Sequence, residues 1–148
     1  MGLATTAAEA TANRPATPKV ALVGPPADYV ASDGRAVAAR DVDLVARMIS
    51  MGKLHHALTG TGAVALAVAA ALPGTLVADI LGGVASADRM VRLGHASGVL
   101  PVGAAASTRD GIVTVDKAVL SRTARRLMEG YVFVPADAVS VGSREAAA

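Results

Sequence analysis

Hydrophobic and polar positions divide the chain into a charge-free centre and two flanks of short apolar runs. The centre extends from Ala57 to Ala78 without a charged side chain, and its Thr61–Leu72 portion is apolar at nearly every position. A helix of this kind has no face suited to water. The pattern therefore predicts a central helix that is the most buried element of the fold. Pro73 and Gly74 mark its C-terminal end.

A membrane span is the alternative for this run, because about 20 apolar residues suffice to cross a bilayer. The run consists mainly of Ala, Val and Gly, contains no Ile, Phe or Trp before Ala78, and is interrupted by Pro73–Gly74. Ala and Gly favour membrane insertion far less than Leu, Ile, Phe and Val do. We therefore expect a buried helix, and no membrane as a partner.

Short strand-like runs lie on both sides of the central helix. Before it, Lys19–Gly24 predicts a short buried strand, whereas Asp41–Gly52 fits either a helix or a strand. After it, apolar runs fill Val91–Ser121, where Asp110–Gly111 is the clearest hairpin signal, and Tyr131–Val134 alternates as a last strand. Strands around one apolar helix predict an α+β domain, a curved sheet wrapped on a central helix.

Composition narrows the classes of function. The 148 residues fit one domain and are 53% hydrophobic. Aromatic residues are limited to Tyr29, Tyr131 and Phe133, and the net charge is only +2, so we expect no nucleic acid as a partner. The absence of cysteine excludes disulfides, thiolate metal ligands and a cysteine nucleophile. The N-terminus lacks the pattern of a signal peptide, which predicts a cytoplasmic protein.

Candidate binding chemistry is concentrated where the central helix begins. Thr59, Gly60, Thr61 and Gly62 stand at this point. Backbone N–H groups lack partners at a helix start, and the helix dipole is positive there. Glycines admit an anion close to the backbone and threonine hydroxyls add donors, which favours a cradle for a carboxylate or a phosphate. The same residues fit a helix cap with tight packing, and both interpretations stay open.

The histidines and a basic run add further polar candidates. They are Lys53, His55, His56, His95, Ser97 and Gly98 in the histidine segments, and Arg122, Arg125 and Arg126 in the run. Adjacent histidines point two ways on a strand, and without a third ligand we expect no metal site. A histidine or cation beside a helix N-terminus would reinforce an anion site. The arginines form either a solvated face or a carboxylate clamp.

These segments resemble the C-terminal half of the PrpF family, which are cofactor-independent isomerases and tautomerases with a diaminopimelate-epimerase-like fold. The matching stretches follow the family order over roughly Pro18–Pro135: PKVALVGPPADYV, RMISMGKLHHALTGTGAVALAVAAALPGT, VRLGHASGVLPVGA and VDKAVLSRTARRLMEGYVFVP. The combination of SMGKLHHA with SRTARRLMEG is specific. The resemblance implies one half of that fold, a mostly antiparallel curved sheet around one helix, and it makes Asp41–Ser50 a strand.

The resemblance implies a proton shift on unsaturated di- or tricarboxylates of the methylaconitate, methylitaconate or oxalomesaconate type. It also implies that no cofactor takes part. The implied substrate-binding residues are Thr59, Gly60, Thr61, Gly62, His95, Ser97 and Gly98, with Met51 and His56 as possible additions. Ala96 departs from the proline that the family usually has between its histidine and serine.

The same resemblance implies that much of the active site lies elsewhere. Family members are much longer, and their catalytic cysteine and lysine belong to the other half, so no catalytic residue is assigned here. The chain resembles a truncated or split member: residues 1–18 form an Ala/Thr-rich segment or linker, 19–135 the C-terminal domain, and 136–148 a tail. An N-terminal partner half or a homodimer would complete it. The alternative is a non-catalytic carboxylate-binding or interaction remnant.

Overall fold

The fold is given by a computed structural model, which describes residues 2 and 4–135; the expected tail at 136–148 lies outside them. The helices are α1 (Ala7–Asn13), η1 (Ala39–Asp41, a 3-10 turn), α2 (Gly60–Ala70) and α3 (Leu76–Ile80). The strands are β1 (Val20–Gly24), β2 (Tyr29–Val30), β3 (Ala36–Val37), β4 (Leu44–Ser50), β5 (Lys53–Leu54), β6 (Val91–His95), β7 (Gly98–Arg109) and β8 (Ile112–Leu120).

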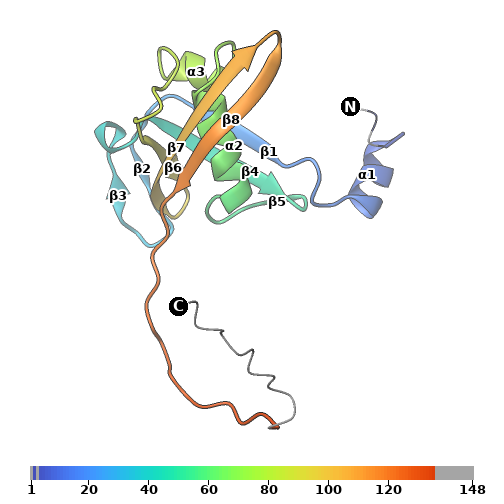
Figure 1. Cartoon of the computed structure of the whole chain (residues 1–148), viewed down its shortest axis with the longest axis vertical. Coiled ribbons are helices and arrows are strands. Elements are labelled where there is room, and N and C mark those ends of the chain that lie inside the picture. The colour runs from blue at the N-terminus through green and yellow to red at the C-terminus, as the bar shows by residue number, and fades with distance from the viewer. Residues whose placement is uncertain (1, 3, 136–148) are drawn as a thin grey trace, which may run out of the picture.

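The main sheet has the strand order β1-β4-β6-β7-β8, and β5 pairs with β4 beside this path. All its pairings are antiparallel except that of β4 with β6. Strands β2 and β3 form a separate two-stranded ribbon. Helix α2 packs against the sheet, mainly on β7 and β8 (Figure 1). The predicted α+β fold, a curved and mostly antiparallel sheet around one apolar helix, is confirmed.

Small side chains let α2 approach the sheet closely. Its buried residues are Gly62, Ala63, Leu66, Ala67 and Ala70. On the sheet they meet a core that includes Leu44, Ala46, Met48, Val91, Leu93, Val102 and Ala104. With so many alanines, each side chain buries little apolar area, so the stability of this core depends on dense contact rather than on large groups.

Only one side of α2 is buried, so the prediction that it is the most buried element is wrong. Thr61 and Ala65 are exposed, whereas β6 is buried at four of its five positions. The sheet covers one face of the helix and α3 contacts it as well, but Thr61 and Ala65 stay exposed among the described residues. The helix also begins one residue earlier and ends two residues earlier than predicted. No helix among the described residues is long and apolar enough to cross a bilayer.

The strand predictions have mixed outcomes. Asp41–Gly52 contains strand β4, in which buried and half-buried positions alternate. Asp110 and Gly111 form the β7–β8 turn with φ of 51° and 76°, the left-handed conformations that a tight hairpin requires. Strand β1 is present, but Val20 and Leu22 are 49% and 61% exposed. The prediction of a buried strand is therefore wrong there, because only the alternate residues Ala21 and Val23 pack against the core.

The predicted strand at Tyr131–Val134 is absent. Residues 121–135, which we call the C-terminal arm, have no regular secondary structure and are exposed throughout. Figure 1 shows the arm running away from the domain. An alternating apolar pattern becomes a strand only beside another strand, and no strand of the described chain lies next to the arm.

The parallel pair β4–β6 is joined by Asp43, which precedes β4. The backbone N–H of Asp43 donates to the carbonyl of Arg92 at 2.8 Å. In return, its carboxylate accepts from the backbone N–H of Arg92 at 2.7 Å and from the guanidinium at 3.0 Å. Burial by itself would raise the pKa of Asp43, but the hydrogen bonds from Arg92 outweigh it and hold the pKa below 3.8.

We expect Asp43→Asn to lower the free energy of unfolding at pH 7 by about 1.5–3 kcal/mol, the range for hydrogen bonds to a charged group. A lowered pKa in the folded state means that this contribution is complete above pH 3.8 and is lost as pH falls through the lower value. Urea unfolding at pH 7 and pH 3 should therefore show a smaller wild-type advantage at the lower pH. Asp33→Asn, which breaks only the exposed pair with Arg35, is the control and should change stability little. Equal effects of the two substitutions would contradict this account.

Candidate functional site

Thr59 caps the helix that carries the candidate anion cradle. Its backbone is extended, with φ −65° and ψ 141°, and its Oγ1 accepts a hydrogen bond from the backbone N–H of Gly62 at 3.1 Å. The same hydroxyl donates to Sδ of Met48 at 3.1 Å. Because both roles of the hydroxyl are filled within the protein, the structure supports the capping interpretation for Thr59.

Gly62 is needed for close packing between α2 and β4. A Cβ atom at this position would lie 2.7 Å from Oγ1 of Thr59, and nearer still to Sδ and Cε of Met48. Met48 is itself buried, with 2% of its surface exposed. The glycine therefore faces the core and the cap rather than an open cradle.

Gly60 and Thr61 are the part of the predicted cradle that stays open. Among the hydrogen bonds of the described residues, none is donated by the backbone N–H of Gly60 or of Thr61. Thr61 is exposed, and a Cβ at Gly60 would meet only Cδ2 of Leu120, at 3.6 Å. Two donors at the positive end of the helix are therefore free for a ligand.

Two adjoining cavities lie at this helix start, and together we call them the α2 cavity. One, of about 540 Å³, is lined by Gly60, Thr61, Val64, Leu120 and Arg122. The other, of about 250 Å³, is lined by Ala57, Leu58, Gly60, His95, Leu100, Leu120, Ser121 and Arg122. They share Gly60, Leu120 and Arg122, so the open helix start, a histidine and an arginine surround one region.

His95 supplies a neutral donor to this cavity. Its side chain lies at the end of β6 and is 9% exposed. Nδ1 accepts from the backbone N–H of Ser97 at 3.1 Å, so the proton of the neutral ring is on Nε2. Nε2 makes no hydrogen bond with the described residues. Every buried side-chain nitrogen among those residues has a hydrogen-bond partner, so Nε2 is not a buried atom and is accessible. Burial, followed by the nearby Arg47 and His56, lowers the pKa of His95 below 6.5.

Arg47 stands behind His95 and was not singled out from the sequence. Its guanidinium donates to the carbonyls of Ala46 at 2.8 Å and Gly94 at 3.2 Å, and lies 5.0 Å from the centre of the Tyr29 ring. An arginine in the middle of an otherwise apolar strand was the available signal. Its positive charge helps keep His95 neutral.

Ser97 and Gly98 position His95 and do not line the α2 cavity. The Ser97 hydroxyl donates to the backbone carbonyl of His56, and it accepts from Ser32 at 3.3 Å. Gly98 pairs with His95 across the β6–β7 turn and has φ 133°, which side chains disfavour. Both residues therefore shape the turn that presents the histidine.

His56 and Met51, the two additional candidates, lie in different surroundings. His56 is exposed, stacks on His55 with ring centres 4.9 Å apart, and is close enough to affect the pKa of His95. Met51 forms the β4–β5 turn with φ 53° and is 65% exposed. It lines a separate cavity beside α1, so the structure does not bring Met51 to the α2 cavity.

The arginines of the basic run differ in their placement. Arg122 lines both parts of the α2 cavity. Arg126 instead forms an exposed pair with Glu129 at 2.7 Å. Arg122, the second residue after β8, is therefore placed to bind a carboxylate in the cavity. Arg126 fits the other interpretation, an arginine on a solvated face.

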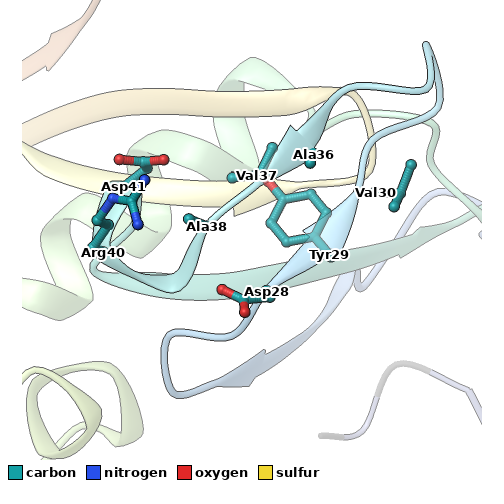
Figure 2. A pocket seen from close by; sticks show the side chains of 8 residues that line it. All are labelled: Asp28, Tyr29, Val30, Ala36, Val37, Ala38, Arg40 and Asp41. Carbon is teal, nitrogen blue, oxygen red and sulfur yellow. The ribbon is translucent and has the colours of Figure 1, made fainter.

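Another cavity, of about 550 Å³, lies between the β2–β3 ribbon and η1 (Figure 2). Its lining contains two carboxylates, Asp28 and Asp41, and one guanidinium, Arg40. The Asp28 carboxylate already has a partner within the protein, since it accepts a hydrogen bond from the backbone N–H of Ala39 at 2.7 Å. This mixture of charges is less suited to an anion than the α2 cavity. In residues 2 and 4–135, no three His, Asp or Glu side chains gather as metal ligands.

Comparisons with known proteins agree on one family. The chain matches the model of the family described as PrpF protein over residues 1–135. It is 57% identical to the 2-methyl-aconitate isomerase of Cupriavidus necator over 138 residues, which are 93% of this chain and 34% of that protein. It is 44% identical to the 3-methylitaconate isomerase of Eubacterium barkeri over 135 residues, 90% of this chain and 34% of that protein.

A solved structure matches as well. The crystal structure of methylitaconate-delta-isomerase superimposes with a TM-score of 0.69 at 43% identity, covering 88% of this chain and 33% of that one. The chain therefore spans about a third of the length of the relatives that it matches.

The packing role of Gly62 can be tested against its neighbour in the same turn. Gly62→Ala should destabilise the protein by about 1–3 kcal/mol, the usual cost of overpacking, because the new methyl group would displace Met48 and the Thr59 hydroxyl. Gly60→Ala is the matched control and should be neutral or slightly stabilising, since its Cβ finds ordinary contact at 3.6 Å. Thermal and urea unfolding measure both. A partial rescue of Gly62→Ala by Met48→Ala would identify the clash, and equal stabilities of the two glycine variants would contradict it.

Proposed function

Because this chain belongs to the PrpF family and forms one half of a diaminopimelate-epimerase-like fold, we propose that it is the carboxylate-binding part of a proton-shifting isomerase. The proposed substrates are unsaturated di- or tricarboxylates, the class to which the names of the relatives point. The proposed reaction needs no cofactor. Residues 19–135 would act as the C-terminal domain of the complete enzyme, with 1–18 as a linking segment.

The α2 cavity is the observation that supports this proposal most directly. Its polar groups are the free N–H groups of Gly60 and Thr61, the Arg122 guanidinium and the accessible Nε2 of His95. All of them donate hydrogen bonds or carry positive charge. Among the described residues that line it there is no carboxylate. A site of donors without a competing anion fits a substrate carboxylate.

In the proposed mechanism, these residues hold the substrate and stabilise the charge that forms. Removal of a proton α or γ to a carboxylate moves negative charge onto that carboxylate. Backbone donors at the start of α2 and the helix dipole would face this charge, and donors fixed before the reaction are the most effective kind. His95, kept neutral by burial, would donate from Nε2 rather than act as a base.

The groups that remove and return the proton are proposed to lie outside this chain. The sequence contains no cysteine, although the family resemblance implies a cysteine and a lysine in that role. Thr59, Gly62, Ser97 and Gly98 would contribute by positioning the cavity, through the cap and the β6–β7 turn. Gly60, Thr61 and His95 would contact the substrate directly, with His56 as an addition, whereas Met51 lies at a separate cavity beside α1.

Binding of trans-aconitate tests the site without requiring turnover. We expect a dissociation constant in the millimolar range, because two or three charge-assisted hydrogen bonds of about 1.5–3 kcal/mol each only partly offset the cost of association. Amide shifts in an NMR titration should be largest at Gly60 and Thr61. Arg122→Ala should weaken binding by about tenfold, the loss of one exposed charge-assisted contact, whereas Arg126→Ala should not. Shifts that cluster away from the α2 cavity would overturn the assignment.

Catalysis is expected only when the remaining part of the fold is supplied. The chain alone should incorporate no solvent deuterium into 2-methylaconitate or methylitaconate. Addition of the part of the Cupriavidus necator isomerase that this chain does not match should restore exchange. Exchange by the pure chain would contradict the placement of the proton-transfer groups. Binding of trans-aconitate without restored exchange would instead favour the non-catalytic remnant.

A further inference from the structure

We propose that Tyr29 is a positioning residue for His95: its hydroxyl holds the β6–β7 turn, and its ring holds Arg47 beside the histidine. Tyr29 lies on the β2–β3 ribbon, which Figure 1 shows beside β6. None of the described residues that line the α2 cavity belongs to this ribbon, so Tyr29 would act on the cavity through His95. For ligand binding the inference rests on the proposed function, whereas the effect on the His95 ring can be measured in the free chain.

The Tyr29 hydroxyl fixes the far side of the turn that presents the histidine. It donates to the backbone carbonyl of Gly98 at 2.6 Å. Gly98 pairs with His95 across the turn and has φ 133°, a conformation that side chains disfavour. Burial raises the pKa of Tyr29 above 10.0, although Arg47 and the backbone of His95 act to lower it. The phenol therefore keeps the proton that it donates to Gly98.

The Tyr29 ring fills space that Gly94 leaves open, directly before His95 in β6. A Cβ atom at Gly94 would lie 3.2 Å from both Cε1 and Oη of the tyrosine, which is tighter than ordinary contact. The Arg47 guanidinium lies 5.0 Å from the ring centre and donates to the Gly94 carbonyl at 3.2 Å. An aromatic face attracts such a cation. Tyr29 and Gly94 thus hold Arg47 close to His95, whose pKa is lowered first by burial and then by this arginine.

Ser32, between the two strands of the ribbon, fastens the same turn at a second point. Its backbone N–H donates to the carbonyl of Ala96 at 2.7 Å, and its hydroxyl donates to that of Ser97 at 3.3 Å. The Ser97 hydroxyl donates in turn to the carbonyl of His56, in the segment that leads into α2. A continuous series of hydrogen bonds therefore joins the ribbon, the β6–β7 turn and the approach to the helix.

These contacts prepare the His95 ring before a ligand arrives. Nδ1 accepts from the backbone N–H of Ser97, which leaves the proton on the accessible Nε2. A group that is already in its binding geometry costs less to order when the ligand binds. Without the Tyr29 hydroxyl the turn would be held less firmly, and His95 would meet more water and adopt other protonation states. Tyr29 thus supports anion binding without touching the anion.

Other charged or titratable groups also surround His95. Arg47 comes from β4, His56 from the segment before α2, and Arg122 from the end of β8. Arg35 lies near the turn, with Nη2 3.6 Å from where a Cβ of Gly98 would be. Tyr29→Phe leaves all four in place and removes a single oxygen atom, so this variant isolates the hydroxyl.

The first experiment follows the His95 ring nitrogens of the isotope-labelled full chain by NMR, between about pH 5 and pH 8. The wild type should show the Nε2–H tautomer and a pKa below 6.5. Tyr29→Phe should move the pKa of His95 toward 6.5 and add the Nδ1–H tautomer. Tyr131→Phe is the matched control, because Tyr131 is 96% exposed, and it should leave the ring unchanged. Identical titration and tautomer of His95 in the wild type and Tyr29→Phe would overturn the proposal.

Arg47→Met separates the role of the ring from that of the hydroxyl. It removes the charge beside His95 and leaves the bond from Tyr29 to Gly98 in place. The pKa of His95 should therefore rise, while the Nε2–H tautomer should persist. An unchanged pKa would overturn the part of the proposal that concerns Arg47.

Binding of trans-aconitate at pH 7 gives a readout that a general loss of stability would not mimic. Tyr29→Phe should weaken binding by about three- to tenfold, the range for one neutral hydrogen bond. In a His95→Leu background the same substitution should have no further effect, because the group that it positions is gone. Equal weakening in both backgrounds would show that Tyr29 does not act through His95. If the wild type fails to bind trans-aconitate, the proposed function fails, and the ring titration still decides the role of Tyr29.

Discussion

The close approach of Gly62, at the start of helix α2, to the Met48 side chain of β4 is the contact on which the candidate site depends. Gly62 leaves space for Met48, and the Thr59 hydroxyl joins the two by accepting from the Gly62 N–H and donating to the methionine sulfur. The Thr59 cap marks where the helix starts, and beyond it the helix packs mainly on β7 and β8. Alanines along the buried face continue the close approach, so that a core with very few aromatic residues still packs densely.

The electrostatics of the candidate site follow from that placement. Since Thr59 satisfies only the N–H of Gly62, the N–H groups of Gly60 and Thr61 remain free at the positive end of the helix. The β6–β7 turn holds His95 at the same cavity as a neutral donor, with Arg47 behind it, and the end of β8 places Arg122 on the other side. Elements from distant parts of the sequence thus bring donors and positive charge to one region. The backbone conformation at Gly98 positions His95, and the cap at Thr59 positions the start of α2.

The surfaces that this chain leaves uncovered belong together. Thr61 of α2, the α2 cavity and the first two residues of the C-terminal arm, Ser121 and Arg122, lie beside the end of β8. In the proposed function, these surfaces are where the rest of the fold would lie, since the chain matches about a third of each relative. Helix α2 is only partly buried for a local reason: Thr61 and Ala65 are exposed, whereas its other residues are buried or half-buried.

Local chemistry determined much of this protein from the sequence by itself. Asp110–Gly111 specifies its hairpin turn because few residues adopt left-handed conformations readily, and the threonine before a glycine-rich apolar run specifies a helix start. The SMGKLHHA and SRTARRLMEG segments were sufficient for the family. Only the tertiary structure decided which glycine packs and which stays open, since Gly60 and Gly62 differ in what lies opposite them and not in their own chemistry. It also decided that Arg122 faces the cavity while Arg126 does not, and that Tyr131–Val134 forms no strand, because pairing depends on a neighbour that the sequence of the strand does not contain.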